Sequence, residues 1–182
     1  MPEKYCVFLR GVNVGGVRIK MDALKKAFAA MSFPEAETIL ATGNVIMTDD
    51  GGDRAALRPA IEAGLGGYFK YDAHVFLRGA AELADVLSAA KDAGAPAGCH
   101  LYYLLCDAPG AVRELAGVFE GLPHRESETF VPINTGAFWV VPAGETLASA
   151  FGQKALGDRK YKSLLTSRNI NTIDKIYAAM RA

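Results

Sequence analysis

Apolar positions follow two different periods in the first 80 residues. A continuous apolar run at 5–9 has the length and residue types of a buried strand. Apolar residues then recur every three or four positions from Met21 to Met31, as on one face of a helix. The pattern predicts, in order, a strand at 5–9, a helix with Met21, Leu24, Phe28 and Met31 inward, a strand at 38–41, a turn at Thr42-Gly43-Asn44, a strand at 45–48, a helix with Leu57, Ile61 and Leu65 inward, and a strand at 73–77.

Two residues bear on the second of these helices. Asp53 is suited to cap its N-terminus, because a carboxylate accepts from the free N–H groups of a first helical turn. Pro59 lies inside the apolar stripe and predicts a kink or a late start. Residues 66–71, with two glycines and three aromatic residues, are expected to form the loop that enters the fourth strand.

The second half shows a similar order of elements. A turn-rich connector at 92–98 precedes it. We predict a strand at 99–106, a helix from Pro109, a hairpin of strands 129–133 and 137–141, and helices at 145–151 and 171–181. Asn171 followed by Asp174 resembles a capping box for the last helix. The half therefore repeats a β-α-β-β-α order, with no residue-level repeat of the first half.

The order of the first half indicates the fold class. A β-α-β-β-α-β sequence of elements is typical of a ferredoxin-like unit. We therefore expect an α+β protein in which a ferredoxin-like antiparallel sheet half packs with a second, smaller α+β half. Within residues 4–78 the strand order should be 4-1-3-2, with two helices on one face. The predicted division is a ferredoxin-like subdomain with a linking helix at 1–92, and a second subdomain with a C-terminal helix at 93–182.

Composition favours a globular protein of the cytoplasm. The 182 residues are 51% hydrophobic and 22% charged, as in a packed core. No apolar run approaches the roughly 20 residues of a membrane span, and the N-terminus does not resemble a signal peptide. The three cysteines, Cys6, Cys99 and Cys106, lie in or beside apolar strands, and an odd number favours reduced thiols. We expect a cytoplasmic location and no membrane partner.

Charge is balanced overall but unevenly distributed. Residues 1–31 carry a net charge of +4, residues 154–182 carry +5, and the middle carries −9. If the basic ends meet in the fold, they would form one positive face, with Arg168 or Lys175 near residues 10–16. Solvated helix faces are the structural alternative. A net charge of zero gives little support to nucleic acid as a partner.

A glycine-rich loop provides the strongest local signal for function. Residues 10–16 read Arg-Gly-Val-Asn-Val-Gly-Gly between a strand and a helix. Glycines permit positive φ angles and free backbone N–H groups, which favour an anion near a helix N-terminus. The loop is neither a Walker A motif, because Val17-Arg18 replace Lys-Ser/Thr, nor a G-x-G-x-x-G fingerprint. The alternative is a tight connection and nothing more.

The expected topology brings further segments to this loop. In a βαββαβ sheet, the end of the first strand and the hairpin after the second lie at the same sheet end. The residues expected to bind a ligand there are Arg10, Gly11, Asn13, Gly15, Gly16, Thr42, Gly43 and Asn44. Tyr68, Phe69 and Tyr71 could stack a base there or seal the core.

The C-terminal segment 160–172 adds a second candidate. It gathers cations, hydroxyls and amides before a helix N-terminus, and the ligand-binding candidates in it are Arg168, Asn169 and Asn171. Plain helix capping by Asn171 and Thr172 is the alternative. No catalytic residue can be named, because no motif of a nucleophile or paired carboxylates is present. His74, His100 and His124 are isolated, so neither a metal site nor a cofactor is expected.

These motifs resemble those of a bacterial family of uncharacterised proteins, the domain of unknown function 1697. Its members typically carry LRGINVGG, an SGN turn and a TRNWNTV-like run, and this chain has LRGVNVGG at 9–16, TGN at 42–44 and SRNINTI at 167–173. Thr42 keeps the hydroxyl of the family's Ser, whereas Ile170 replaces its Trp. The resemblance spans nearly the whole chain and implies an α+β fold with a ferredoxin-like half and no established activity.

Three functions remain open from the sequence. The leading hypothesis is a protein that binds an anionic, phosphate-bearing ligand such as a nucleotide at the glycine loop and Arg10. The alternatives are an enzyme that acts on a phosphorylated small molecule at the same site, and a module for protein interaction or dimerisation through edge strands. The oligomeric state is open.

Overall fold

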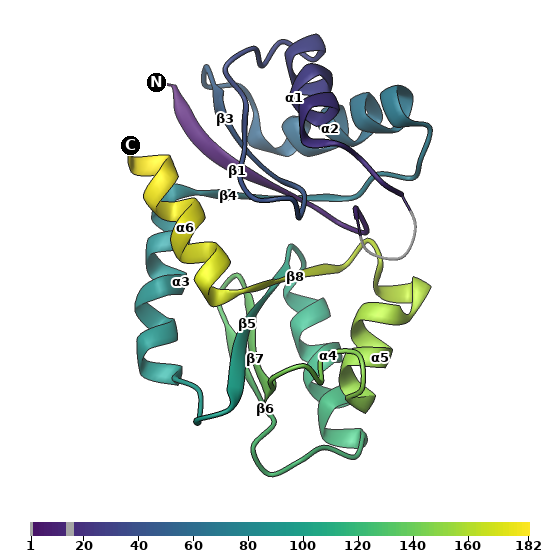
Figure 1. The fold of residues 1–182 in the computed structure, drawn as a ribbon, viewed down its shortest axis with the longest axis vertical. Coiled ribbons are helices and arrows are strands. Elements are labelled where there is room, and N and C mark those ends of the chain that lie inside the picture. Colours follow the sequence, from purple (N-terminus) through teal and green to yellow (C-terminus); the bar gives the residue numbers. More distant parts are fainter. Residues whose placement is uncertain (1, 14–16) are drawn as a thin grey trace. The chain divides into compact units, whose positions relative to one another are not determined.

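The protein is a mixed α+β molecule with two four-stranded antiparallel sheets. The computed structural model describes residues 2–13 and 17–182 (Figure 1). The chain divides into two compact units. Unit 1 comprises Met1–Ala81 and Ile176–Ala182, and unit 2 comprises Glu82–Lys175. Among the described residues, no helix has the length and apolar character needed to cross a membrane. The expected subdomain boundary between residues 92 and 93 stays a prediction.

Unit 1 contains the predicted ferredoxin-like sheet. Its strand order is β2-β3-β1-β4, and all neighbouring pairs are antiparallel. This is the predicted order 4-1-3-2. The elements are β1 (Glu3–Leu9), α1 (Met21–Ala30), β2 (Glu37–Thr38), β3 (Asn44–Asp49), α2 (Arg54–Phe69) and β4 (Val75–Gly79), followed by α3 (Ala80–Ala93).

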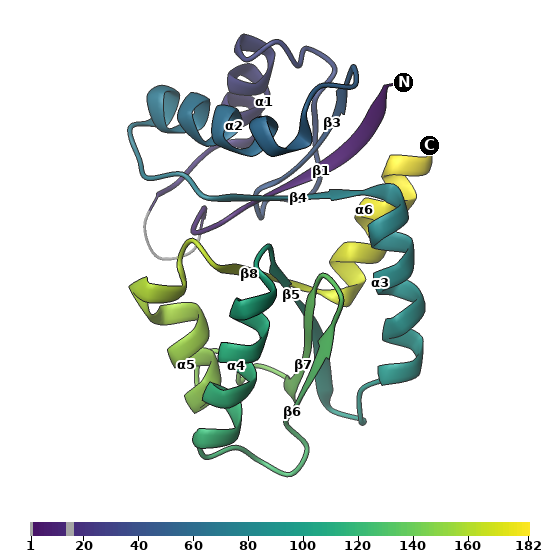
Figure 2. The same ribbon diagram turned by 180° about the vertical axis from the view of Figure 1, so that it is seen from behind.

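Helices α1 and α2 cover one face of this sheet (Figure 2). Alternate residues of β1 face them, because side chains alternate across a strand. The cluster they form contains Tyr5, Val7 and Leu9 from β1, Val45 and Met47 from β3, Val75 and Leu77 from β4, Leu24 and Phe28 from α1, and Ile61 and Leu65 from α2. The other side chains of β1, among them Cys6 and Phe8, belong to the opposite face.

Several boundaries in unit 1 differ from the sequence-based prediction. The strand expected at 38–41 is only Glu37–Thr38, because Leu40 has a φ of 58° that ends the extended conformation. Helix α2 begins at Arg54, so the late start expected from Pro59 is wrong. Asp53 caps it as predicted and accepts from Ala55 N at 2.9 Å. The helix continues to Phe69, so most of the expected loop at 66–71 is helical. Strand β4 begins two residues later than expected.

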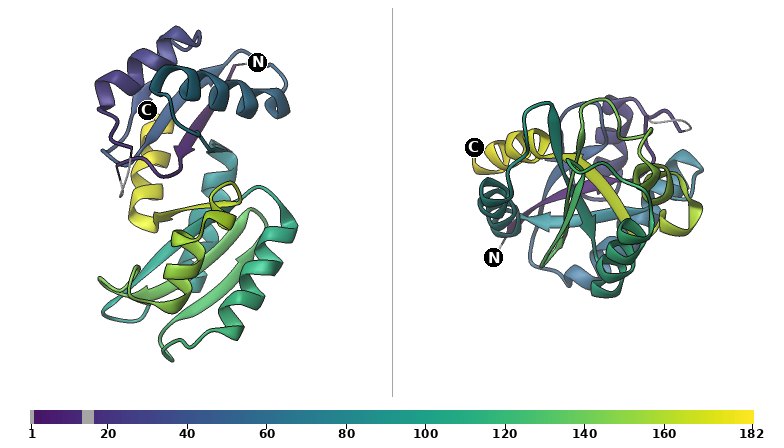
Figure 3. Two further views of the ribbon diagram at one scale, coloured as in Figure 1. Left: turned by 90° about the vertical axis from the view of Figure 1, so that its right-hand side faces the viewer. Right: turned by 90° about the horizontal axis from the view of Figure 1, so that it is seen from below.

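Unit 2 has its own sheet, with the order β6-β7-β5-β8. Helices α4 and α5 pack on one face of it through Leu115, Phe119, Trp139, Phe151 and Leu165 (Figure 3). The elements are β5 (Cys99–Cys106), α4 (Pro109–Gly121), β6 (Thr129–Ile133), β7 (Gly136–Pro142), α5 (Ala150–Gly157), η1 (Arg159–Tyr161), β8 (Leu165–Asn169) and α6 (Ile170–Arg181).

The end of unit 2 corrects three expectations. Residues 165–169, for which no strand was predicted, form the edge strand β8 beside β5. The helix expected at 145–151 instead spans Ala150–Gly157, where Ser149 caps it by accepting from Gly152 N at 2.9 Å. Helix α6 is capped by Asn169, whose Oδ1 accepts from Asn171 N at 2.9 Å. Asn171 is therefore a residue of the first helical turn and not its cap.

The two units repeat one topology. If the four strands of each unit are numbered along the chain, both sheets have the spatial order 2-3-1-4. In both units a helix follows the fourth strand directly. The registers also correspond, because Arg78 lies opposite Cys6 in the first strand of unit 1 and Arg168 lies opposite Tyr103 in the first strand of unit 2. The second unit is thus a complete βαββαβ unit rather than the β-α-β-β-α order expected.

Candidate functional site

The glycine loop and the turn at 42–44 meet at one end of the sheet of unit 1. Leu9 N donates to Gly43 O at 2.8 Å, and the side chain of Asn13 donates to Ala41 O at 2.9 Å. A Cβ on Gly43 would lie 3.1 Å from the Cβ of Leu9, so only glycine permits this approach without adjustment. The structure therefore brings together two of the segments that the topology argument placed at this sheet end.

The side chain of Asn13 bonds to the backbone of two neighbouring segments. Its Nδ2 donates to Ile19 O at 3.1 Å as well as to Ala41 O, and its Oδ1 accepts from Ile19 N at 2.9 Å. Its backbone has a φ of 61°, a left-handed conformation that asparagine tolerates better than most residues. Both ends of the amide thus bond to backbone groups outside the loop, at Ile19 and Ala41, and we assign Asn13 a structural role.

Asn44 and Thr42 serve the turn in the same way. Asn44 is fully buried, and its Nδ2 donates to Ile39 O at 3.0 Å and to Thr42 Oγ1 at 2.9 Å. These contacts close the turn around Gly43, which has a φ of 72°. The side chains of Asn44 and Thr42 therefore stabilise the turn through hydrogen bonds within the protein.

Arg10 is the cation of this sheet end. Only 8% of its surface is exposed, and its backbone N–H donates to His74 O at 2.9 Å. Burial lowers the pKa of the Arg10 guanidinium, because desolvation disfavours the charged form. A largely desolvated guanidinium at the end of a strand is a group that an anion would stabilise. Gly11 follows it with a φ of 71°, and the candidates Gly15 and Gly16 lie outside the described residues.

The aromatic residues near this end divide between core and surface. Phe69 and Tyr71 pack against the apolar cluster of unit 1, whereas Tyr68 is 49% exposed. The ring centroids of Tyr68 and Phe69 are 4.8 Å apart. Within the described residues, the Tyr71 hydroxyl is buried without a hydrogen-bond partner. Burial, with a smaller contribution from Glu62, raises the pKa of Tyr71 to about 12. Two of the three rings thus seal the core.

The C-terminal candidates belong to β8 and the start of α6. The Arg168 guanidinium donates to Thr166 Oγ1 at 3.1 Å and to Ser167 O at 2.8 Å. Asn169 caps α6, and Asn171 is exposed in its first turn. Arg168 to Asn171 lie in unit 2, whereas residues 10–44 lie in unit 1. Their expected proximity to the glycine loop stays a prediction.

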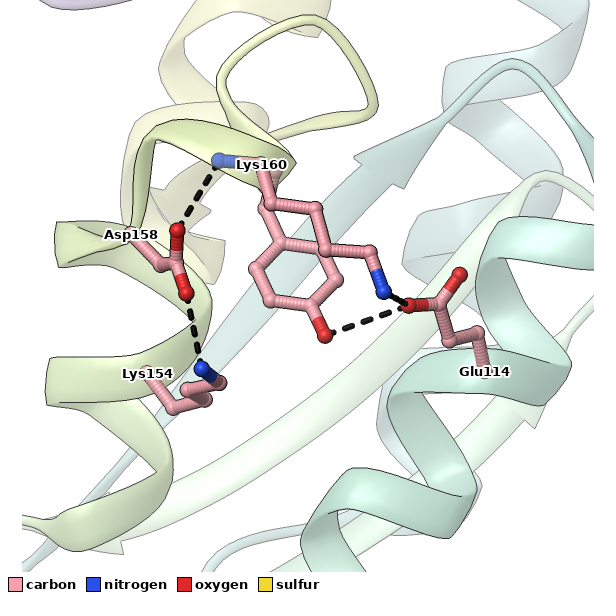
Figure 4. Close-up of polar contacts among 5 residues, drawn as sticks. Glu114, Lys154, Asp158 and Lys160 are labelled. Carbon is pink, nitrogen blue, oxygen red and sulfur yellow. Dashed lines mark hydrogen bonds and ion pairs between the residues drawn. The ribbon is translucent and has the colours of Figure 1, made fainter.

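Two lysines that precede β8, Lys154 and Lys160, are paired with acidic side chains. Lys160 forms an ion pair with Glu114, and Lys154 contacts Asp158 at 2.7 Å (Figure 4). Glu114 also accepts from the Tyr161 hydroxyl at 3.2 Å, and Asp158 accepts from Lys160 N at 3.0 Å. The hydrogen bond from Lys160 lowers the pKa of Glu114, and that from Lys154 lowers the pKa of Asp158. This exposed cluster balances positive charge against negative charge.

Sequence reasoning missed a histidine–carboxylate pair beside Arg10. The Nε2 atom of His74, a residue that looks isolated in the sequence, lies 3.0 Å from Asp72 Oδ2. Side chains two residues apart on an extended chain point the same way, so this pairing could have been noticed. Sequence reasoning also overlooked that Val-Phe-Leu-Arg-Gly occurs at 7–11 and again at 75–79. The described residues contain no group of three or more His, Cys, Asp or Glu side chains placed to hold a metal ion.

Comparison with known families identifies the chain at the level of its family. The sequence model described as "Protein of unknown function (DUF1697)" matches residues 2–135. The chain belongs to this family. The match includes the glycine loop and the turn at 42–44, and it ends before the run at 167–173.

Solved structures support the fold. The chain is similar to a conserved bacterial protein, SP0830 from Streptococcus pneumoniae, with a TM-score of 0.79 and 20% sequence identity over 100% of both chains. At this identity the likeness concerns the fold. No curated protein matches the sequence.

Proposed function

We propose that this family member binds an anionic, phosphate-bearing ligand at the end of β1, with Arg10 as the residue that contacts the anion. The observation that carries the proposal is the burial of Arg10 at a sheet end where the Asn13 side chain bonds to Ala41 and the Asn44 side chain bonds to Thr42. A desolvated guanidinium forms stronger charge-assisted hydrogen bonds than an exposed one, and its planar fork matches phosphate.

The surrounding contacts refine the proposed site. Asn13, Thr42 and Asn44 are engaged in hydrogen bonds within the loops, so their role is to position Arg10 and the backbone. Gly11 is exposed beside Arg10, which leaves room for a ligand to approach the backbone. Arg168, Asn169 and Asn171 remain second candidates, because the run at 167–173 resembles the family pattern.

Substitution of Arg10 tests the proposal. Arg10→Ala should weaken the binding of inorganic phosphate, pyrophosphate or adenosine monophosphate by about tenfold or more, because a charge-assisted hydrogen bond contributes about 1.5–3 kcal/mol. Isothermal titration calorimetry measures this for each anion, and added salt should weaken binding further. Circular dichroism establishes that the variant is folded.

Arg18→Ala is the matched control. It removes the same charge near the same loop, but Arg18 is exposed. It should change the affinity by less than about threefold, as expected for a solvent-screened charge. Equal affinities of the wild type and Arg10→Ala, or no binding of any of the three anions by the wild type, would refute the proposal.

At one edge of each sheet, the strand itself gives little support to the interaction alternative. Strand β2 has only two residues, and β6 contains Pro132, which has no N–H to donate to an added strand. For the setting of the protein we infer a bacterial cytoplasm. A similar fold occurs in a bacterial protein, and among the described residues Cys6, Cys99 and Cys106 form no disulfide. Fractionation of cells that express the protein checks this inference.

A further inference from the structure

His74 lies next to Arg10 across two paired strands. The register of β1 and β4 pairs Phe8 with Phe76 and Leu9 with Val75. Arg10 and His74 form the next opposed pair, joined by the 2.9 Å hydrogen bond from Arg10 N to His74 O. Opposed residues of antiparallel strands project from the same face, with Cβ atoms about 5 Å apart. The imidazole and the guanidinium therefore extend from one face at the same sheet end.

The ring of His74 is oriented by Asp72. The Nε2–Oδ2 distance of 3.0 Å lets Nε2–H donate to the carboxylate. A neutral imidazole that carries its proton on Nε2 presents Nδ1 as an acceptor. Among the described residues, Nδ1 has no hydrogen-bond partner, and 18% of the His74 side chain is exposed. One ring nitrogen is thus held by the protein, and the other has no partner among the described residues.

From this geometry we infer that His74 is a second anion-contacting residue that selects a ligand bearing an acidic hydroxyl, such as phosphate, over an anion without one. The inference rests on the proposed anion site at Arg10. Arg10 would supply charge to either kind of anion. His74 Nδ1 would accept the P–OH proton of hydrogen phosphate in a hydrogen bond that sulfate cannot make, because sulfate carries no proton at neutral pH.

Hydrogen phosphate and sulfate are suitable probes, because they have the same charge and similar size. The wild type should bind hydrogen phosphate more tightly than sulfate. His74→Ala should weaken phosphate binding about three- to tenfold and leave sulfate binding within about twofold, as expected for the loss of one hydrogen bond. His124→Ala is the control, because the His124 ring stacks on Phe119 in unit 2 and its Nδ1 lies 2.8 Å from Leu122 O.

Nitrogen chemical shifts of the histidine rings report the contact directly. Added phosphate should shift the His74 Nδ1 resonance in the wild type, and sulfate should shift it much less. Asp72→Ala tests the positioning role of the carboxylate. It should raise the fraction of His74 that carries its proton on Nδ1, and it should reduce the preference for phosphate.

The outcomes separate this inference from the proposed function. If the wild type binds phosphate in an Arg10-dependent way but His74→Ala binds it equally well, the role of His74 is refuted and the Arg10 site stands. If His74→Ala loses phosphate and sulfate to the same extent, the acceptor role is refuted. If the wild type binds neither anion, both the inference and the proposed function fail.

Discussion

Single residues show how far chemistry can be predicted from type and spacing. Arg10 was singled out because it follows an apolar strand and precedes glycines, and it is indeed the buried cation of that sheet end. The sequence also indicates Asn13 and Asn44, because they lie in the glycine loop and in the turn at 42–44, yet their amides bond to backbone groups of the protein itself. A sequence does not distinguish these uses, because an amide that closes a turn and an amide that binds a ligand both favour loops rich in glycine.

Tyr71 gives a prediction at this scale. Its hydroxyl is buried without a partner among the described residues, so Tyr71→Phe should raise the free energy of unfolding at neutral pH by about 1 kcal/mol. The pKa of Tyr71 is raised from 10.0 to about 12 in the folded protein. As the pH rises, the Tyr71 hydroxyl therefore loses its proton in the unfolded chain before it does so in the folded protein. Below pH 10 the pKa difference contributes its full amount to the free energy of unfolding, and this contribution is lost as the pH rises to about 12.

Urea unfolding at neutral pH and between pH 10 and 12 measures both effects. The wild type should lose more stability than Tyr71→Phe over the alkaline range, by an amount on the order of 2 kcal/mol. Comparing the two variants cancels the titration of the other tyrosines. A lower stability of Tyr71→Phe at neutral pH would show that the hydroxyl has a partner in solution.

Elements were predictable where their burial pattern is strong. Strand β1, helix α1 and helix α6 have continuous or periodic apolar positions, and each lies where the pattern indicated. Strand β8 was missed because its sequence, Leu-Thr-Ser-Arg-Asn, contains one apolar residue. It forms because β5 offers a free edge and Leu165 fills the core, and both are tertiary causes that local propensity does not contain.

The connection between the glycine loop and the turn at 42–44 depends on Asn13. Asn13→Gly keeps the left-handed backbone conformation and removes three hydrogen bonds, so it should lower the free energy of unfolding by about 1–2 kcal/mol. Asn13→Asp keeps the acceptor for Ile19 N and removes the two donors. We expect a stability order of wild type, then Asn13→Asp, then Asn13→Gly.

Amide hydrogen exchange at Ile19 distinguishes the contribution of the Asn13 acceptor from that of its two donated hydrogen bonds. Its N–H donates to Asn13 Oδ1, so protection should fall in Asn13→Gly and persist in Asn13→Asp. Unchanged protection of Ile19 in Asn13→Gly would contradict the structural role of the side chain.

The full repeat of one topology, including strand order and register, becomes visible at the scale of the whole molecule. The two units share strand order and register, but equivalent positions carry different chemistry. Arg10 follows the last residue of β1, whereas the corresponding position after β5 is Asp107. The fourth strands do share an arginine at equivalent positions, Arg78 in β4 and Arg168 in β8. Because so few residue types persist, the sequence indicates the repeat only as a partial β-α-β-β-α order of elements. Of the two units, only unit 1 has an arginine directly after its first strand.

The apolar pattern predicts the C-terminal helix but not the unit to which its last turns belong. Helix α6 starts in unit 2, yet its residues from Ile176 onward belong to unit 1. Ile176 and Met180 are buried, so the end of the chain contributes apolar burial to a unit otherwise built from the first 81 residues. A fragment that stops at Ala81 would lack this contribution and should be less stable than unit 1 in the full chain.

Met180→Ala tests this dependence in the intact protein. Removing a buried methionine side chain should cost about 2–4 kcal/mol, since the transfer free energy is lost and a cavity remains. The loss should fall on unit 1, so amide exchange should accelerate in β1 and β3 more than in β5 and β7. Lys175→Ala, an exposed position on the same helix, should leave both sheets unchanged. If exchange accelerated equally in the two sheets, or only in β5 and β7, the assignment of the last helical turns to unit 1 would be wrong.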